Sequence, residues 1–139
     1  MTFEQMNLDQ NIIQALHTLG YEKPLPVQEQ VIPNILSGKD CIVKSRTGSG
    51  KTASFAIPII QNLEIDERSP QAFVLTPTRE LALQIQQDFD RIGTFKKIKT
   101  LPIFGKQPFK FQKEDLKQRC HVVIGTPGRV LDHLQQETL

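Results

Sequence analysis

The sequence predicts an α/β fold in which helices flank a parallel β-sheet. Short apolar runs alternate along the chain with longer segments in which apolar residues recur at helical spacing. The runs are continuously apolar, which is typical of strands buried on both faces of a parallel sheet. At 139 residues the chain has room for one domain. Together these observations favour a layered fold with right-handed crossovers.

Four short segments are predicted as strands, at residues 41–43, 72–75, 100–104 and 122–124. The third contains Pro102, which cannot donate a hydrogen bond to a neighbouring strand. We therefore expect this strand either at an edge of the sheet or not at all.

Six helices are predicted between and around these strands. The first carries an apolar stripe from Leu8 to Leu19, with Asn7 as its N-cap and Gly20 at its end. Pro26 favours the start of the second, which ends at Gly38. The third begins near Lys51 and runs towards Leu63. Prolines at positions 33 and 58 are expected to bend or interrupt the second and third helices. The remaining helices are expected at 79–92, 109–119 and 128–136.

Charge is unevenly distributed along the chain. The whole sequence has a formal net charge of +2, yet residues 91–120 hold nine Lys and Arg against two Asp and Glu, a local charge of +7. This segment is either a surface for a phosphate backbone or an ordinary solvated face. No apolar stretch is long enough to span a membrane, and the first residues do not resemble a secretory signal. With Cys41 and Cys120 far apart in sequence, we expect a reduced, cytoplasmic protein.

A glycine-rich segment follows the first predicted strand and precedes a helix. Backbone N–H groups of such a loop, together with the positive end of the helix, can surround a polyphosphate. Lys51 would contact the β and γ phosphates, and the hydroxyl of Thr52 would bind a magnesium ion. The alternative is a glycine-rich turn that binds nothing. Ser45 stands where the strict phosphate-loop pattern has its first glycine. The candidate nucleotide-binding residues are Ser45, Arg46, Thr47, Gly48, Ser49, Gly50, Lys51 and Thr52.

Three further segments, together with this loop, resemble the DEAD-box family of RNA helicases. The segment Gly20–Gln28 resembles the family's Q motif, and Phe3 lies seventeen positions before it, where the family has an isolated aromatic residue. Residues 77–82, Pro-Thr-Arg-Glu-Leu-Ala, resemble motif Ia, and Thr126-Pro-Gly-Arg resembles motif Ib. Order and approximate spacing agree across essentially the whole chain. Residues 43–47 and 103–106 look most like the bacterial DbpA/YxiN-type members.

The resemblance implies that Tyr21 and Gln28 contact adenine and that Phe3 packs nearby. The Gln28 amide offers a donor and an acceptor, and an aromatic ring can stack on the base. Tyr21 could instead be an ordinary core aromatic, and Phe3 a hydrophobic anchor. Leu25 replaces the threonine that is usual in this motif, so a hydrogen bond from that hydroxyl is absent.

The resemblance also implies contacts with the sugar-phosphate backbone of RNA. Backbone N–H groups and guanidinium groups grip phosphates without reading bases. Thr78 and Thr126 lie at strand-to-helix corners and could also, or only, cap the next helix. For Arg129 the alternative is a structural salt bridge. The residues assigned to RNA are Pro77, Thr78, Arg79, Gly105, Thr126, Pro127, Gly128 and Arg129.

In family terms the parent protein would be an ATP-dependent RNA helicase that uses ATP and Mg²⁺, binds RNA without sequence preference and acts as a monomer. Residues 1–139 would form the N-terminal portion of its first RecA-like domain, a P-loop NTPase fold, with the Q-motif region at 1–38 and the other motifs at 39–139. The Asp-Glu-Ala-Asp motif and a second RecA-like domain are expected beyond residue 139, so the chain alone should be inactive. The alternatives are a non-enzymatic nucleotide- or RNA-binding module and another P-loop NTPase, such as a DNA helicase.

Overall fold

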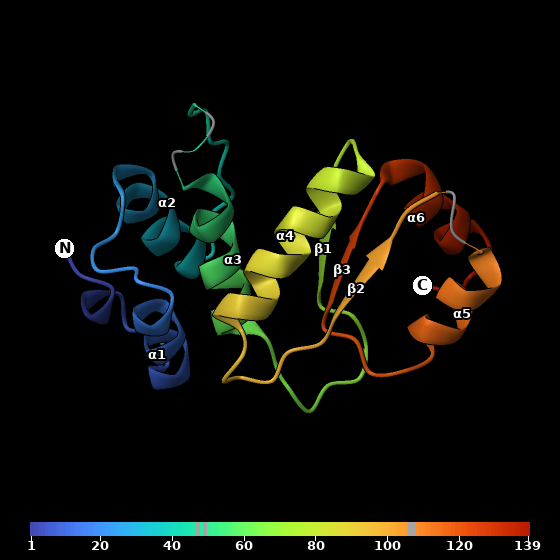
Figure 1. Cartoon of the computed structure of the whole chain (residues 1–139), viewed down its shortest axis with the longest axis horizontal. Helices are drawn as coiled ribbons and strands as arrows, with labels where there is room; N and C mark the ends of the chain where they lie inside the picture. Colours follow the sequence, from blue (N-terminus) through green and yellow to red (C-terminus); the bar gives the residue numbers. More distant parts are fainter. Residues whose placement is uncertain (47, 49, 106–107) are drawn as a thin grey trace. The chain divides into compact units, whose positions relative to one another are not determined.

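The computed structural model describes residues 1–46, 48, 50–105 and 108–139. Its sheet contains three parallel strands, β1 (Ala72–Leu75), β2 (Thr100–Ile103) and β3 (Val122–Gly125), in the order β1-β3-β2 (Figure 1). All four β3 residues are buried, as expected for a strand with a neighbour on each side. Pro102 lies on the edge strand β2, as predicted, so its missing N–H costs no hydrogen bond within the sheet.

The helices closely follow the predicted positions. A 3₁₀ turn at Glu4–Met6 precedes them, and they are α1 (Gln10–Thr18), α2 (Pro26–Leu36), α3 (Lys51–Asn62), α4 (Arg79–Ile92), α5 (Phe109–Leu116) and α6 (Pro127–Gln135). Helices α2 and α3 continue through Pro33 and Pro58 without interruption. The predicted N-cap at Asn7 is wrong: Asp9 occupies the N-cap of α1, because Asn7 adopts a left-handed conformation at the end of the 3₁₀ turn.

The chain divides into two compact units. The first comprises Met1–Leu63 and Arg91–Lys97 and contains α1, α2 and α3. Its core is apolar and includes the fully buried side chains of Ile12, Leu16, Ile32, Ile57 and Ile60. Burying these side chains is the main source of stability for a unit whose described residues form helices and loops.

The second unit comprises Glu64–Asp90 and Ile98–Leu139 and contains the sheet. In Figure 1, α5 and α6 lie on one side of the strands and α4 on the other. A core cluster of Ile103, Cys120, Val123 and Val130 joins the sheet to α6. The predicted layered α/β architecture is therefore confirmed.

One predicted strand is wrong. Residues 41–43 form no strand, and Ile42 is fully exposed. Strand β1 also departs from the prediction, since Phe73 and Leu75 are about half exposed instead of buried. Continuous apolar runs report a tendency to be buried, but a strand also requires a partner with which to pair its backbone groups. Among the described residues, no strand pairs with 41–43 and none covers the outer edge of β1.

No helix among the described residues combines the length and apolar character that crossing a membrane requires.

Candidate functional site

Two glycines of the glycine-rich segment before α3 have a left-handed backbone conformation. Gly48 and Gly50 have φ values of +80° and +89°, in the left-handed region that favours glycine. Gly50 is also the N-cap of α3, so the positive end of that helix dipole lies at the loop. Thr47 and Ser49 lie outside the described residues.

Two side chains of the first turn of α3 lie beside this loop. The Nζ of Lys51 donates a hydrogen bond to the Ser45 carbonyl oxygen at 2.6 Å, so the lysine side chain points back towards Ser45. Thr52 follows it and is half-buried. A phosphate would be a stronger acceptor for Lys51 than a neutral carbonyl, because both partners would then be charged. The hydrogen bond thus holds the Lys51 ammonium group beside Ser45.

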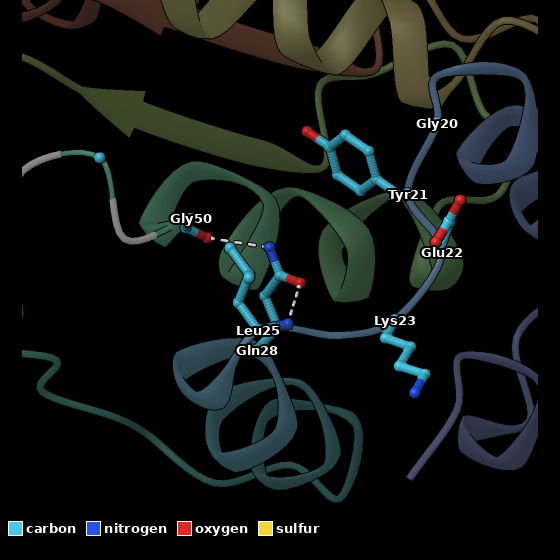
Figure 2. Close-up of a pocket in the computed structure, with 8 residues that line it drawn as sticks. Gly20, Tyr21, Glu22, Lys23, Leu25, Gln28 and Gly50 are labelled. Atoms are coloured by element: carbon cyan, nitrogen blue, oxygen red, sulfur yellow. Dashed lines mark hydrogen bonds between the residues drawn. The ribbon is translucent and has the colours of Figure 1, made fainter.

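A pocket of about 450 Å³ lies next to the loop in the same unit (Figure 2). Its lining comes from the segment before α2, the first turn of α2 and the glycine-rich loop. The lining residues are Gly20, Tyr21, Glu22, Lys23, Leu25, Gln28, Gly48 and Gly50. The sequence prediction therefore brought together two residues, Tyr21 and Gln28, that the structure places in one pocket.

Gln28 connects this pocket with the loop. Its side chain is 2% exposed, its Oε1 accepts a hydrogen bond from the Leu25 N–H at 2.9 Å, and its Nε2 donates to the Gly50 carbonyl oxygen at 3.4 Å (Figure 2). A Cβ on residue 50 would approach Gln28 Nε2 to 2.7 Å. Both the conformation and the close approach thus require glycine at this position.

Phe3 lies beneath the pocket and is not one of the residues that line it. Its side chain is 1% exposed, and its ring centroid lies 6.5 Å from that of Tyr21, with the planes inclined by 35°. This geometry lets Phe3 support Tyr21 from within the core of the unit. Phe3 itself is too deeply buried to present a ring face to a base.

The second group of candidate residues follows the three strands of the other unit. Because the strands are parallel, their carboxyl ends lie at one edge of the sheet. Hydrogen bonds from Thr76 N–H to the Gly125 carbonyl and from Thr126 N–H to the Ile103 carbonyl, both 2.9 Å, join the three corners. Most side chains at these corners are exposed, including those of Pro77, Thr78, Arg79 and Pro127, and so are Gly105 and Gly128.

The two corner threonines differ in their capping role. Thr78 Oγ1 accepts a hydrogen bond from the Leu81 N–H at 3.2 Å and so caps the first turn of α4, as predicted. Thr126 occupies the N-cap position of α6, but its side chain makes no capping hydrogen bond. Capping therefore accounts for the position of Thr78 and leaves the Thr126 hydroxyl to be explained by another contact.

The two candidate arginines are held differently. Arg79 is exposed, and its guanidinium carbon lies 4.9 Å from the centre of the buried Phe104 ring. Arg129 is only 17% exposed, and its Nε lies 3.6 Å from Asp132 Oδ2. Its Nη1 donates to the Gln112 Oε1 at 3.1 Å. The salt bridge considered for Arg129 is thus present, and it fixes the guanidinium next to the exposed turn at residues 127–128.

Sequence reasoning missed the residues that support these side chains. Gln112 and His133 are buried polar residues in contact with each other, and neither belongs to a motif. Lys96 was counted in the basic segment, but its Nζ is engaged with the carbonyl oxygens of Ile60 and Gln61 at 2.7 and 3.0 Å. Among the described residues, no group of three or more His, Cys, Asp or Glu side chains could hold a metal ion.

Comparison with known proteins agrees with this geometry. A sequence model of the DEAD/DEAH box helicase family matches residues 25–139. The chain is 53% identical over 137 residues to the ATP-dependent RNA helicase DbpA of Bacillus subtilis, covering 99% of this chain and 29% of that protein. It is 41% identical over 138 residues to the DEAD-box ATP-dependent RNA helicase CshA of Geobacillus kaustophilus, covering 99% of this chain and 30% of the relative. The chain therefore spans less than a third of the length of these relatives.

Solved structures show the same fold. A DEAD box protein from Methanococcus jannaschii superposes with a TM-score of 0.94 at 42% identity, over all of this chain and 38% of that one. A variant of Dbp5 from S. cerevisiae, solved with RNA and ADP BeF₃, gives a TM-score of 0.90 at 28% identity, over 99% of this chain and 35% of that one. These matches confirm the predicted RecA-like α/β fold. With a family model that matches residues 25–139, more than half of its length, this chain belongs to the DEAD/DEAH box helicase family.

Proposed function

We propose that this chain forms the nucleotide-binding part and a portion of the RNA-binding surface of an ATP-dependent RNA helicase. The whole protein would couple ATP hydrolysis to the unwinding of short RNA duplexes or to the remodelling of RNA–protein complexes. The proposal is supported by the family and by relatives that are named ATP-dependent RNA helicases. The observation that carries it is the position of Gln28, whose amide contacts the phosphate loop and lines the adjacent pocket.

The proposed preference for adenine follows from the hydrogen-bonding capacity of Gln28. A glutamine amide has two lone pairs on its oxygen and two N–H groups. One lone pair accepts from Leu25 and one N–H donates to Gly50. The second lone pair and the second N–H match the N6 amino group and N7 of adenine, whereas guanine presents two acceptors, O6 and N7. Tyr21, on the same pocket wall, supplies an aromatic ring for stacking.

The triphosphate would occupy the loop before α3. Lys51 would exchange its hydrogen bond with the Ser45 carbonyl for contacts with the phosphates. Arg46 and the backbone N–H groups of Thr47 to Gly50 belong to the same proposed site. The Thr52 hydroxyl, in the first turn of α3, is a suitable single protein ligand for Mg²⁺, an ion that usually keeps water and phosphate oxygens as its other ligands. When bound, the ion would offset the negative charge of the phosphates.

RNA would bind along the carboxyl ends of the strands in the other unit. The exposed corners offer backbone N–H groups at glycines 105 and 128, the hydroxyls of Thr78 and Thr126, and two guanidinium groups. These groups recognise phosphates and sugars, so binding would not depend on sequence. That a structural neighbour was solved with RNA and ADP BeF₃ supports RNA as the ligand. A second RecA-like domain, monomeric action and a cytoplasmic location are part of the same proposal.

The test compares ADP with GDP binding to the full-length protein. We expect ADP to bind at least about 10-fold more tightly, since one well-matched bidentate contact discriminates by about 1–3 kcal/mol. In the Gln28→Ala variant the two affinities should become nearly equal. Gln30→Ala, an exposed glutamine on the same helix, is the matched control and should keep the preference. Equal affinities in the unmodified protein would contradict the proposal.

A second measurement separates an RNA helicase from the other enzyme considered. We expect single-stranded RNA to stimulate ATP hydrolysis by the full-length protein, and DNA of the same sequence to do so weakly. Equal stimulation by DNA would favour a DNA helicase, and nucleotide binding without any hydrolysis would favour a binding module.

A further inference from the structure

The side chain of Gln112 makes hydrogen bonds to three residues in two segments of its unit, the end of β2 and helix α6. It projects from α5, is 6% exposed, and its Nε2 donates to the Phe104 carbonyl oxygen at 2.9 Å. Its Oε1 receives Arg129 Nη1 at 3.1 Å and lies 3.0 Å from His133 Nε2. The opposite orientation of the amide would point its N–H groups at a guanidinium, which can only donate. The surrounding groups thus permit one orientation of the side chain.

His133 is the second α6 side chain that holds the Gln112 amide in place. It is completely buried on α6, and its ring stacks on Phe109 with centroids 4.1 Å apart and planes inclined by 11°. Since Gln112 Oε1 can only accept, His133 Nε2 must carry the hydrogen. The other ring nitrogen, Nδ1, lies 2.7 Å from Thr138 Oγ1, whose one hydrogen can go either to Nδ1 or to the His133 carbonyl oxygen 3.1 Å away. A neutral imidazole satisfies both contacts at once.

The guanidinium of Arg129 takes part in this network. Gln112 binds its Nη1, Asp132 lies near its Nε, and its carbon lies 5.7 Å from the centre of the Phe109 ring. Helices α5 and α6 are neighbours in Figure 1, and these contacts join them. A free arginine side chain loses conformational entropy when it is fixed. Here the protein fold has already fixed it, so a phosphate that binds this guanidinium need not bear that cost.

We propose that Gln112, held in place by His133, is a positioning residue that orients the Arg129 guanidinium for binding an RNA phosphate. The inference rests on the proposed function, because it assumes that Arg129 contacts the RNA backbone. It assigns a role in RNA affinity to a buried glutamine outside the sequence motifs. A purely structural role for Gln112 would affect folding stability and leave the electrostatics of RNA binding unchanged.

The experiment measures the affinity of the full-length protein for a single-stranded oligouridine at several salt concentrations. The variants are Gln112→Leu, Arg129→Gln and the double variant, with Gln118→Leu as a control at an exposed glutamine. Each phosphate contact adds about 0.7 to the slope of log affinity against log salt for single strands. We expect Gln112→Leu to weaken binding about 3- to 10-fold and to reduce this slope, as Arg129→Gln does. The double variant should be no weaker than Arg129→Gln, because both changes remove the same contact.

The outcomes separate the inference from the function on which it rests. If Arg129→Gln leaves affinity and slope unchanged, the proposed RNA contact of Arg129 fails and the inference fails with it. If Arg129→Gln weakens binding but Gln112→Leu leaves the slope unchanged, only the inference is overturned. Nucleotide affinity should stay unchanged in every variant.

A second variant covers the case in which Gln112→Leu does not fold. His133→Phe keeps an aromatic ring against Phe109 and removes the hydrogen bond to Gln112. We expect it to weaken oligouridine binding about 2- to 5-fold with a reduced salt slope. An unchanged slope in this folded variant would equally overturn the inference.

Discussion

Among single residues, Gly50 combines a backbone conformation with a close contact in the site. Its φ of +89° is left-handed, and a Cβ there would approach both Gln28 Nε2 and Leu25 Cδ1 to 2.7 Å. We expect Gly50→Ala to lower the free energy of unfolding by about 1–2 kcal/mol through backbone strain. It should also weaken ADP binding by about 10-fold or more, because Gln28 must move. Urea denaturation and ADP titration measure the two effects.

Gly38 provides the matched control for this prediction. Its φ of +88° is nearly the same, but a Cβ there would meet nothing within 4 Å, and it does not line the pocket. Gly38→Ala should therefore cost similar stability while ADP affinity stays unchanged. Equal loss of ADP affinity in both variants would show that strain alone, without displacement of Gln28, explains the effect.

For single residues, a role can be predicted from the sequence when neighbouring residues in the sequence determine it. Gln28 and the loop glycines could be predicted, because a motif of adjacent residues defines them. Gln112 and His133 could not, because they meet only when α5 and α6 pack, and they are 21 positions apart in sequence. A buried polar pair of this kind leaves no periodic or motif signal in a single chain.

Among the elements, the carboxyl end of α3 depends on a lysine from the basic segment. The Nζ of Lys96 contacts the carbonyl oxygens of Ile60 and Gln61 in the last turn of the helix and lies 3.7 Å from Asp9 Oδ2. The Ile60 carbonyl also accepts a hydrogen bond from the Leu63 N–H at 3.2 Å. We expect Lys96→Met to lower the free energy of unfolding by about 1–2 kcal/mol. The exposed Lys99→Met, in the same basic segment, should change it by less than about 0.5 kcal/mol. Equal effects in urea denaturation would contradict the capping role.

Helix α6 gives the chain a pH-dependent contribution to stability. Burial, and then the nearby positive charge of Arg129, lower the pKa of His133, while Asp132 opposes the shift. Near pH 6.5, the ordinary pKa of a histidine, His133 therefore binds more protons in the unfolded chain than in the folded one. The free energy of unfolding falls as the pH drops through that value. Above about pH 7.5 this contribution should no longer change. Denaturation curves at several pH values, for the unmodified chain and for His133→Phe, measure this pH dependence. If His133 is not the cause, the two proteins should show the same pH dependence.

The elements also show why some predictions failed while others held. Helices were predicted closely, because their periodicity, caps and glycine stops lie within the element itself. The strand at 41–43 was wrong because a strand depends on pairing with another segment, which a local apolar run cannot report. Strand β2 was predicted despite its proline, since the missing donor fixes its place at an edge.

In the whole molecule, the two compact units divide the two proposed binding roles. The nucleotide residues all belong to the unit formed by Met1–Leu63 and Arg91–Lys97, and the proposed RNA residues all belong to the other unit. The order of motifs along the sequence predicted both groups. It did not predict the division, because α4 is one continuous helix whose residues 79–90 and 91–92 fall in different units.

The set of proposed binding residues in these two units predicts what the 139-residue polypeptide can do by itself. It carries the proposed base pocket, phosphate loop and Thr52, so we expect weak ADP binding. Hydrolysis also needs carboxylates that hold Mg²⁺ and orient the attacking water. Among the described residues, no three or more His, Cys, Asp or Glu side chains form a group that could hold a metal ion. We therefore expect no RNA-stimulated release of phosphate from ATP by this polypeptide, and clear release by the full-length protein. Turnover by the 139-residue polypeptide that Lys51→Ala abolishes would show that its own residues complete the catalytic site.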